Sequence, residues 1–164
     1  MLNLTVLGLI IGNTLSNATP VLLTGLGGMI SEKSGVVNIG LEGMMTIGAL
    51  VAATVGYYVG NPWLGFLAGG LAGMFFGLIH ALVSVTFAGD QTISGIAINT
   101  LAPGLALFLA RLFFDGATQT PSIALENKIP RLFDGLITNQ ALKNIFSQYA
   151  TVYIALISVI LLYV

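Results

Sequence analysis

The residues of this chain that could do chemistry are polar side chains standing inside long apolar stretches. Asn38 and Glu42 are four apart in GVVNIGLEGMM, so a helix would place both on one face. Gln91 and Asn99 stand in a later apolar stretch. Polar groups within a membrane span are costly and usually face a cavity or a partner. We therefore predict that Asn38, Glu42 and Asn99 line a solute pathway, with Gln91 as a weaker candidate.

Each candidate also has a structural interpretation. Glu42 could lie at a membrane interface, pair with Lys33 and anchor the end of a helix. Asn99, ahead of the helix-kinking Pro103, could bond across helices. A lone buried histidine such as His80 is more often hydrogen-bonded to a neighbour than part of a proton relay. The sequence leaves these alternatives open.

Composition indicates that the apolar stretches lie in a lipid bilayer. Apolar residues make up 56% of the 164 residues and charged residues only 7%, whereas a soluble domain carries about 25% charged residues. The mean hydropathy is +0.98. A net charge of −1 provides no basic field for nucleic acid. With no cysteine, one histidine and scattered carboxylates, we expect no metal, no cofactor and no enzyme active site.

The charges and the Gly-Pro punctuation predict a single all-α transmembrane domain over 1–164. Continuous apolar runs without alternation favour helices over barrel strands. A charged, proline-containing loop is predicted at about 115–146, with a short helix near 139–146. We expect a bundle of about five transmembrane helices, at about 4–30, 37–59, 63–88, 92–113 and 147–164.

Glycines distinguish the second and third predicted helices. Gly35, Gly40 and Gly43 interrupt the start of the second, which is typical of a broken helix whose freed backbone lines a cavity. In the third, glycines recur every four residues and form a smooth face against which another helix can pack closely. This packing face consists of Gly65, Gly69, Gly73 and Gly77.

The order of polar residues and glycines in SEKSGVVNIGLEGMM, Ser31 to Met45, resembles the permease subunits of nucleoside-type ABC importers. These belong to the branched-chain amino acid and simple-sugar ABC permease group. The stretches GDQTISG, from Gly89, and NTLA, from Asn99, are similar to the same group. The resemblance covers most of Met1 to Phe114 and implies a fold like that of type II ABC importers.

The resemblance also implies a topology, partners and a location. It places the loop at about 115–146 outside the cytoplasm and Gln91 near the cytoplasmic end of the pathway. Members are multi-pass subunits of the bacterial inner membrane. They pair with a second permease, with ABC ATP-binding subunits and with an extracytoplasmic substrate-binding protein. Members are roughly twice this length, so we expect the chain to be an N-terminal portion. The C-terminal half, with the loop that couples to the ATPase, would then be missing.

The sequence thus predicts a permease that moves nucleosides or related small polar solutes, with simple sugars as a variant, by alternating access driven by partner ATPases. One alternative is a small stand-alone channel or secondary transporter, which would need inverted repeats or a paired intramembrane carboxylate. Another is a membrane fragment that does not transport.

Overall fold

The computed structural model describes residues 3–124 and 127–163, which fold as helices in two compact units. One unit comprises residues 1–26 and 129–164, and the other residues 27–128. Apart from an isolated bridge between Arg131 and Tyr149, the described residues 3–124 and 127–163 contain no strand pairing. The all-α prediction is confirmed. The helices are α1 (Leu4–Lys33), α2 (Leu41–Val59), α3 (Pro62–Ala81), the π-helical η1 (Leu82–Thr86), α4 (Gln91–Phe113), α5 (Gln140–Phe146) and α6 (Ala150–Tyr163).

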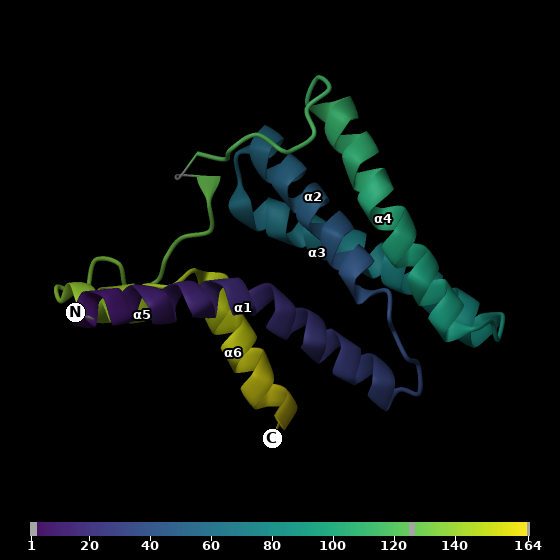
Figure 1. Ribbon diagram of the computed structural model, residues 1–164, viewed down its shortest axis with the longest axis horizontal. Coiled ribbons are helices and arrows are strands. Elements are labelled where there is room, and N and C mark those ends of the chain that lie inside the picture. The colour runs from purple at the N-terminus through teal and green to yellow at the C-terminus, as the bar shows by residue number, and fades with distance from the viewer. Residues whose placement is uncertain (1–2, 125–126, 164) are drawn as a thin grey trace. The chain divides into compact units, whose positions relative to one another are not determined.

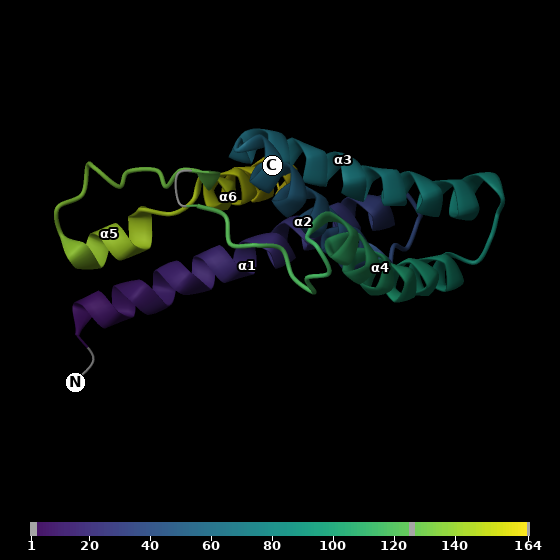
Figure 2. The ribbon, with the colours of Figure 1, turned by 90° about the horizontal axis from the view of Figure 1, so that it is seen from above.

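The second unit is built on α2, which packs against both α3 and α4 (Figure 1). Its buried core is formed by Met44, Ile47, Phe76, Ile98 and Ala102, one or two from each helix. The chain turns sharply between α2 and α3. Gly60 ends α2 with a left-handed φ of +68°, and the Asn61 side chain caps α3 by accepting from the N–H groups of Trp63 and Leu64. The reversal from α3 to α4 follows η1 (Figure 2).

The backbone between α1 and α2 is not helical. Ser34 to Gly40 form turns and an extended stretch, and Gly35 has a φ of +86°. The prediction of one helical face carrying Asn38 and Glu42 is therefore wrong, because α2 begins only at Leu41. The predicted break lies ahead of α2 rather than inside it. An Asx-type hydrogen bond, from the Gly40 N–H to the Asn38 side-chain oxygen at 3.0 Å, favours the turn over a helix.

Small residues let α2 and α3 approach closely. A Cβ on Gly65 would lie 2.7 Å from the carbonyl oxygen of Ala52, and one on Gly69 would lie 2.7 Å from that of Gly48. Gly73 has only ordinary contact, and Gly77 has open space around it. The contact is therefore confined to the first half of the predicted glycine face.

The first unit packs the N-terminal part of α1 against α5. A Cβ on Gly8 would meet the Ala141 carbonyl oxygen at 2.5 Å, and one on Gly12 would clash with the carbonyl oxygen of Asn144. Next to this contact, the buried Gln148 accepts a 2.7 Å hydrogen bond from the Ser16 hydroxyl. The helix α5 occupies the range for which the sequence predicted a short helix.

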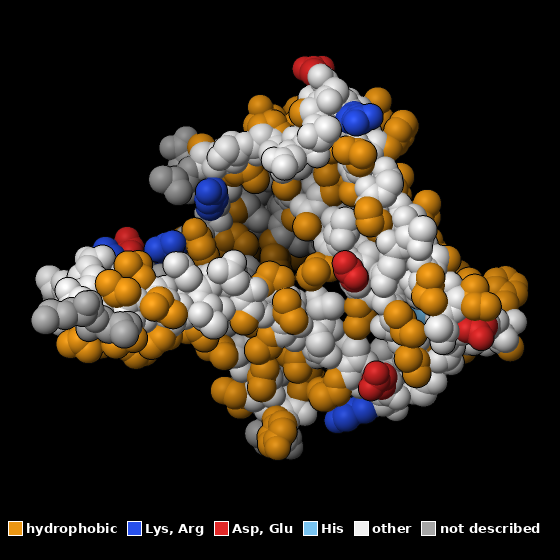
Figure 3. All heavy atoms as spheres, in the orientation of Figure 1, with side chains coloured by type: hydrophobic (Ala, Val, Ile, Leu, Met, Phe, Trp, Pro, Cys, Tyr) orange, Lys and Arg blue, Asp and Glu red, His pale blue; other side chains and the backbone are white. Residues whose placement is uncertain are grey.

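In the described part of the chain, three helical stretches are long and apolar enough to cross a membrane: Leu4–Lys33, Pro62–Thr86 and Gln91–Phe113. The helix α6 is apolar but shorter, with 14 residues. Large apolar side chains on these helices point outward, and Figure 3 shows hydrophobic groups over much of the visible surface with few charges among them. Such a surface suits lipid or further protein rather than water. That five helices span the membrane stays a prediction.

Candidate functional site

The candidate site is the non-helical peptide ahead of α2 together with the side chains of α3 and α4 that bind it. Gln91, the first residue of α4, accepts a 2.7 Å hydrogen bond from the Val37 N–H. Its amide nitrogen lies 3.5 Å from the Gly35 carbonyl oxygen. Gln91 therefore binds the beginning of this peptide.

Asn99 binds the same peptide at its other end. Its Oδ1 accepts from the Gly43 N–H at 2.7 Å, and its Nδ2 donates to the Ile39 carbonyl at 2.8 Å. Between the two, a Cβ on Gly95 would lie 2.9 Å from the Gly40 nitrogen, so the backbones almost touch. Gln91, Gly95 and Asn99 are spaced by four and so share one face of α4.

The other two sequence candidates behave differently from each other. The side-chain oxygen of Asn38 accepts a hydrogen bond from the Gly40 N–H, and its amide nitrogen lies 3.6 Å from the Met44 sulfur. Glu42 lies in the first turn of α2 and is exposed. Within residues 3–124 and 127–163 its carboxylate has no ion pair, and the alternative of a pair with Lys33 is not realised. Glu42 is thus the candidate whose polar group is free to meet a solute.

His80 belongs to the site although it was not among the predicted pathway residues. It is 2% exposed, with Nε2 3.3 Å from the Val37 carbonyl oxygen and Nδ1 3.0 Å from the Ser94 hydroxyl. Because a carbonyl can only accept, Nε2 carries a proton in this arrangement, and in the neutral imidazole Nδ1 then accepts from the Ser94 hydroxyl. The hydrogen-bonded alternative for His80 is the one realised. A lone histidine in an apolar helix can be recognised in the sequence, but the sequence does not show that Val37 and Ser94 are its hydrogen-bond partners.

The groove beside this site is mainly apolar. A groove of about 400 Å³ between α3 and α4 is lined mainly by side chains such as Phe76, Ile93 and Leu101. No group of three or more His, Cys, Asp or Glu residues that could hold a metal ion occurs in the part of the chain that the structure describes. The arrangement provides hydrogen-bonding groups and one free carboxylate.

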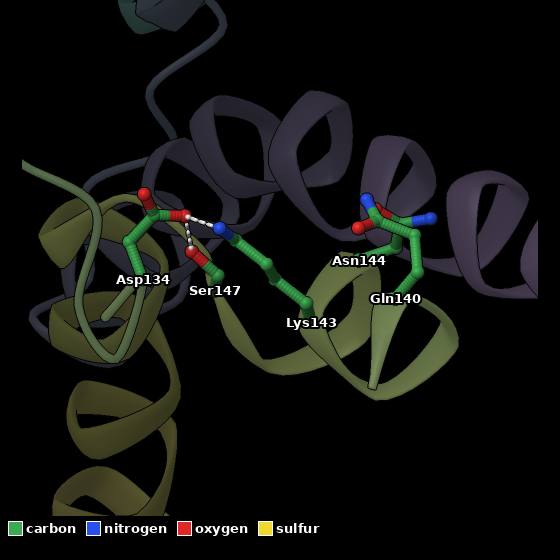
Figure 4. A network of polar contacts seen from close by, with 5 residues as sticks. All are labelled: Asp134, Gln140, Lys143, Asn144 and Ser147. Carbon is green, nitrogen blue, oxygen red and sulfur yellow. Dashed lines mark hydrogen bonds and ion pairs between the residues drawn. The ribbon is translucent and has the colours of Figure 1, made fainter. Parts of the chain in front are cut away.

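A second polar cluster lies in the other unit (Figure 4). The Asp134 carboxylate accepts a 2.8 Å hydrogen bond from the Ser147 hydroxyl and lies 3.3 Å from the Lys143 ammonium. The Ser147 hydrogen bond, followed by Lys143, holds the pKa of Asp134 below its ordinary value. Because Ser147 is 2% exposed, its hydroxyl needs this acceptor, and the cluster fixes the loop ahead of α6 rather than forming a reactive site.

Comparison with known proteins gives consistent matches. Residues 10–164 match the family described as the branched-chain amino acid transport system permease component. The chain is 46% identical over 138 residues to a guanosine ABC transporter permease of Bacillus subtilis, covering 79% of this chain and 43% of that protein. It is 40% identical over 114 residues to a nucleoside ABC transporter permease of Lactococcus lactis, covering 66% of this chain and 36% of that protein.

A glucose ABC transporter permease of Haloferax volcanii is 31% identical over 109 residues, covering 63% of this chain and 29% of that protein. The chain therefore spans less than half the length of these curated relatives. No solved structure matches it.

The match to a permease family and the three apolar helices together make this a multi-pass membrane protein. The predicted family resemblance is confirmed, and the family is one of transport permeases rather than enzymes. The chain belongs to the family of branched-chain amino acid transport system permease components.

Proposed function

We propose that this chain is part of the permease subunit of an ABC importer for nucleosides or related small polar solutes. The names of its relatives, which refer to guanosine, nucleosides and glucose, support this class of solute. Solute would cross by alternating access in the bacterial inner membrane. The partners would be a second permease, ABC ATP-binding subunits and an extracytoplasmic substrate-binding protein.

The observation that carries the proposal is irregular backbone beside a candidate membrane span. The helix α4 is apolar and long enough to cross a bilayer. Asn99 is two turns beyond Gln91, which corresponds to about 12 Å along the helix axis. The peptide from Val37 to Gly43 runs beside these two turns, through the hydrogen bonds at each end. Irregular backbone at membrane depth is tolerated where it is buried in protein or lines a water-filled cavity.

The free carboxylate points to the same place. Glu42 is exposed at the start of α2, and an unpaired carboxylate facing lipid is strongly disfavoured. We therefore place the pathway along the surface of α2 that carries Glu42. Asn38, Gln91 and Asn99 form its wall, with their amide groups largely occupied by backbone hydrogen bonds.

Uptake by the complete transporter tests this assignment. Glu42→Gln keeps the size of the side chain and removes its charge, and we expect it to lower uptake of a labelled nucleoside at least severalfold at unchanged abundance. Glu32→Gln is the matched control, because Glu32 is an exposed carboxylate at the end of α1. Equal uptake by both variants would remove Glu42 from the pathway.

The energy source tests the class of transporter. Uptake should require ATP hydrolysis by the partner subunits and should continue when the proton gradient is collapsed. Uptake driven by a proton gradient without ATP would instead identify a secondary transporter.

A further inference from the structure

The start of α2 lacks a cap of its own. Gly40 stands at the N-cap position, where it provides no side chain for the exposed N–H groups of the first turn. Asn99 of α4 takes that place, since its Oδ1 accepts from the Gly43 N–H at 2.7 Å. Serine, threonine, aspartate or asparagine normally does this from within the same helix.

Asn99 also binds the residue that precedes the cap. Its Nδ2 donates to the Ile39 carbonyl at 2.8 Å, so one amide group bridges the end of the non-helical peptide and the first turn of α2. The fit is close, because a Cβ on Gly43 would lie 2.7 Å from the Ile98 carbonyl oxygen. The backbones of α2 and α4 therefore almost touch beside this cap.

We infer that Asn99 is a positioning residue that caps α2 from α4 and thereby fixes the depth at which Glu42 is presented. The relevance of Glu42 to transport rests on the proposed function. The cap itself rests only on the contacts of Asn99 with Ile39 and Gly43. Any movement of α4 must therefore either carry the start of α2 with it or break both hydrogen bonds.

His80 and Gln91 complete the attachment of the peptide. The Val37 N–H donates to Gln91, and the Val37 carbonyl accepts from His80 of α3. The peptide is thus bound by side chains from both helices before Asn99 caps α2. These contacts attach the beginning of the peptide to both α3 and α4.

The test uses a cap that can be switched by pH. In Asn99→Asp, the protonated acid can donate to the Ile39 carbonyl and accept from the Gly43 N–H, as asparagine does. The ionised acid can only accept, so it keeps the Gly43 hydrogen bond but loses the Ile39 hydrogen bond and places a charge against that carbonyl. The bridge from Asn99 to Ile39 should therefore be intact at acidic pH and broken at alkaline pH, whereas Asn99→Ala should lack both hydrogen bonds at every pH.

A single cysteine reports the opening, because the natural sequence contains none. Met44 is 8% exposed next to the capped turn, so Met44→Cys should react slowly with a small water-soluble thiol reagent while the cap is closed. After correction for thiol ionisation, we expect the reaction to accelerate about tenfold or more in Asn99→Ala, as when a buried backbone group loses its partner. Asn99→Asp should react slowly at acidic pH and faster as pH rises, with a rate that stays below that of Asn99→Ala because the Gly43 hydrogen bond remains.

Thr100→Val is the matched control, since the Thr100 hydroxyl bonds only to Ile96 in its own helix. Glu42, His80 and Asp90 are the titratable groups near the cap, and they are present in every variant, so their own titration cancels. Rates in Asn99→Asp that do not depend on pH and equal those of Thr100→Val would overturn the inference. If Asn99→Ala fails to assemble, the pH series on Asn99→Asp still decides the question within one protein.

The thiol readout is independent of transport. If Glu42→Gln leaves uptake unchanged while Asn99→Asp still switches, the cap stands and the pathway assignment fails. If Glu42→Gln abolishes uptake while Asn99→Asp does not switch, the pathway stands and the cap fails.

Discussion

The helix α2 makes two close backbone contacts, and they are built differently. Against α3 the contact depends on close backbone packing. Gly65 and Gly69 pack directly against the carbonyl oxygens of Ala52 and Gly48. Against α4 the contact combines close approach at Gly95 with hydrogen bonds from Asn99 to the backbone of Ile39 and Gly43.

The difference separates a fixed contact from one that can be exchanged. Where glycines bring backbones together, the attraction is dispersion over a matched surface, and any separation leaves a void or admits lipid. Where side-chain amides bind backbone groups, water in a pathway can replace them at little net cost. If the chain acts in transport as proposed, we expect α2 and α3 to stay together and the contact between the start of α2 and α4 to be the one that changes.

The largest effect should come from adding a methyl group to the α2–α3 contact. In Gly69→Ala the new Cβ would lie 2.7 Å from the Gly48 carbonyl oxygen and 2.8 Å from the Ala52 Cβ. Neither backbone can yield easily, so we expect the free energy of unfolding in detergent to fall by about 2 kcal/mol.

The matched control is the adjacent glycine. Nothing lies within 4 Å of the position that a Cβ would take on Gly70, so Gly70→Ala should be neutral or stabilise α3 by about 0.5 to 1 kcal/mol. Similar losses for both variants in chemical unfolding would show that shape at Gly69 is not what holds the two helices.

A smaller effect should follow from the same change at the α2–α4 contact. In Gly95→Ala the Cβ would lie 2.9 Å from the Gly40 nitrogen and 3.0 Å from the Ile39 Cβ. These atoms belong to a non-helical peptide that can shift by a few tenths of an ångström, so we expect a loss of about 1 kcal/mol in the same unfolding measurement.

Gly104→Ala in α4 is the control for that change, because nothing lies within 4 Å of a Cβ there. A loss for Gly95→Ala as large as that for Gly69→Ala would contradict the distinction between a fixed and an adjustable side.

A third substitution tests the turn that leads into the peptide. Gly35 has a φ of +86° and open space around it, so Gly35→Ala should lose about 1 kcal/mol of stability through backbone strain alone. Gly35→Asn should recover part of this loss, since asparagine tolerates left-handed φ better than alanine does. Thermal unfolding of the two variants in detergent compares them directly, and an equal loss for both would point to a cause other than φ.

The sequence was more informative about the glycine contact between α2 and α3 than about the hydrogen-bonded contact between α2 and α4. Spacing by four shows where Gly65 and Gly69 share a helix face, although it does not show that Gly73 and Gly77 lie beyond the contact. The bond between Gly43 and Asn99 joins residues 56 apart in the chain, and periodicity within one helix cannot reveal such a pair.

The misplacement of Asn38 has a local cause. Its spacing from Glu42 suggested one helical face, but the side chain of Asn38 accepts from the N–H of Gly40 two residues on, which stabilises a turn. The Asn-Ile-Gly order was a readable turn signal, and it competes with the helix. The membrane class followed from composition, because a chain with 7% charged residues cannot cover a soluble surface. The all-α class followed from apolar runs that do not alternate with polar residues as barrel strands do.

The smallest effect concerns the other unit, where a polar cluster is fixed by charge rather than by glycine packing. The Ser147 hydrogen bond and the Lys143 ammonium lower the pKa of Asp134. A carboxyl group whose pKa is lower in the folded chain stabilises the fold above its unfolded pKa, and this contribution is lost as pH falls through the folded value.

Ser147→Ala should raise the pKa of Asp134 toward its ordinary value, as measured by carboxyl NMR. Ser158→Ala, whose hydroxyl bonds only to Ile154, should leave it unchanged. Since Asp134 is solvent-exposed, the change in its charge interactions should alter the free energy of unfolding at neutral pH only slightly. A large pH-dependent loss of stability in Ser147→Ala would contradict this expectation.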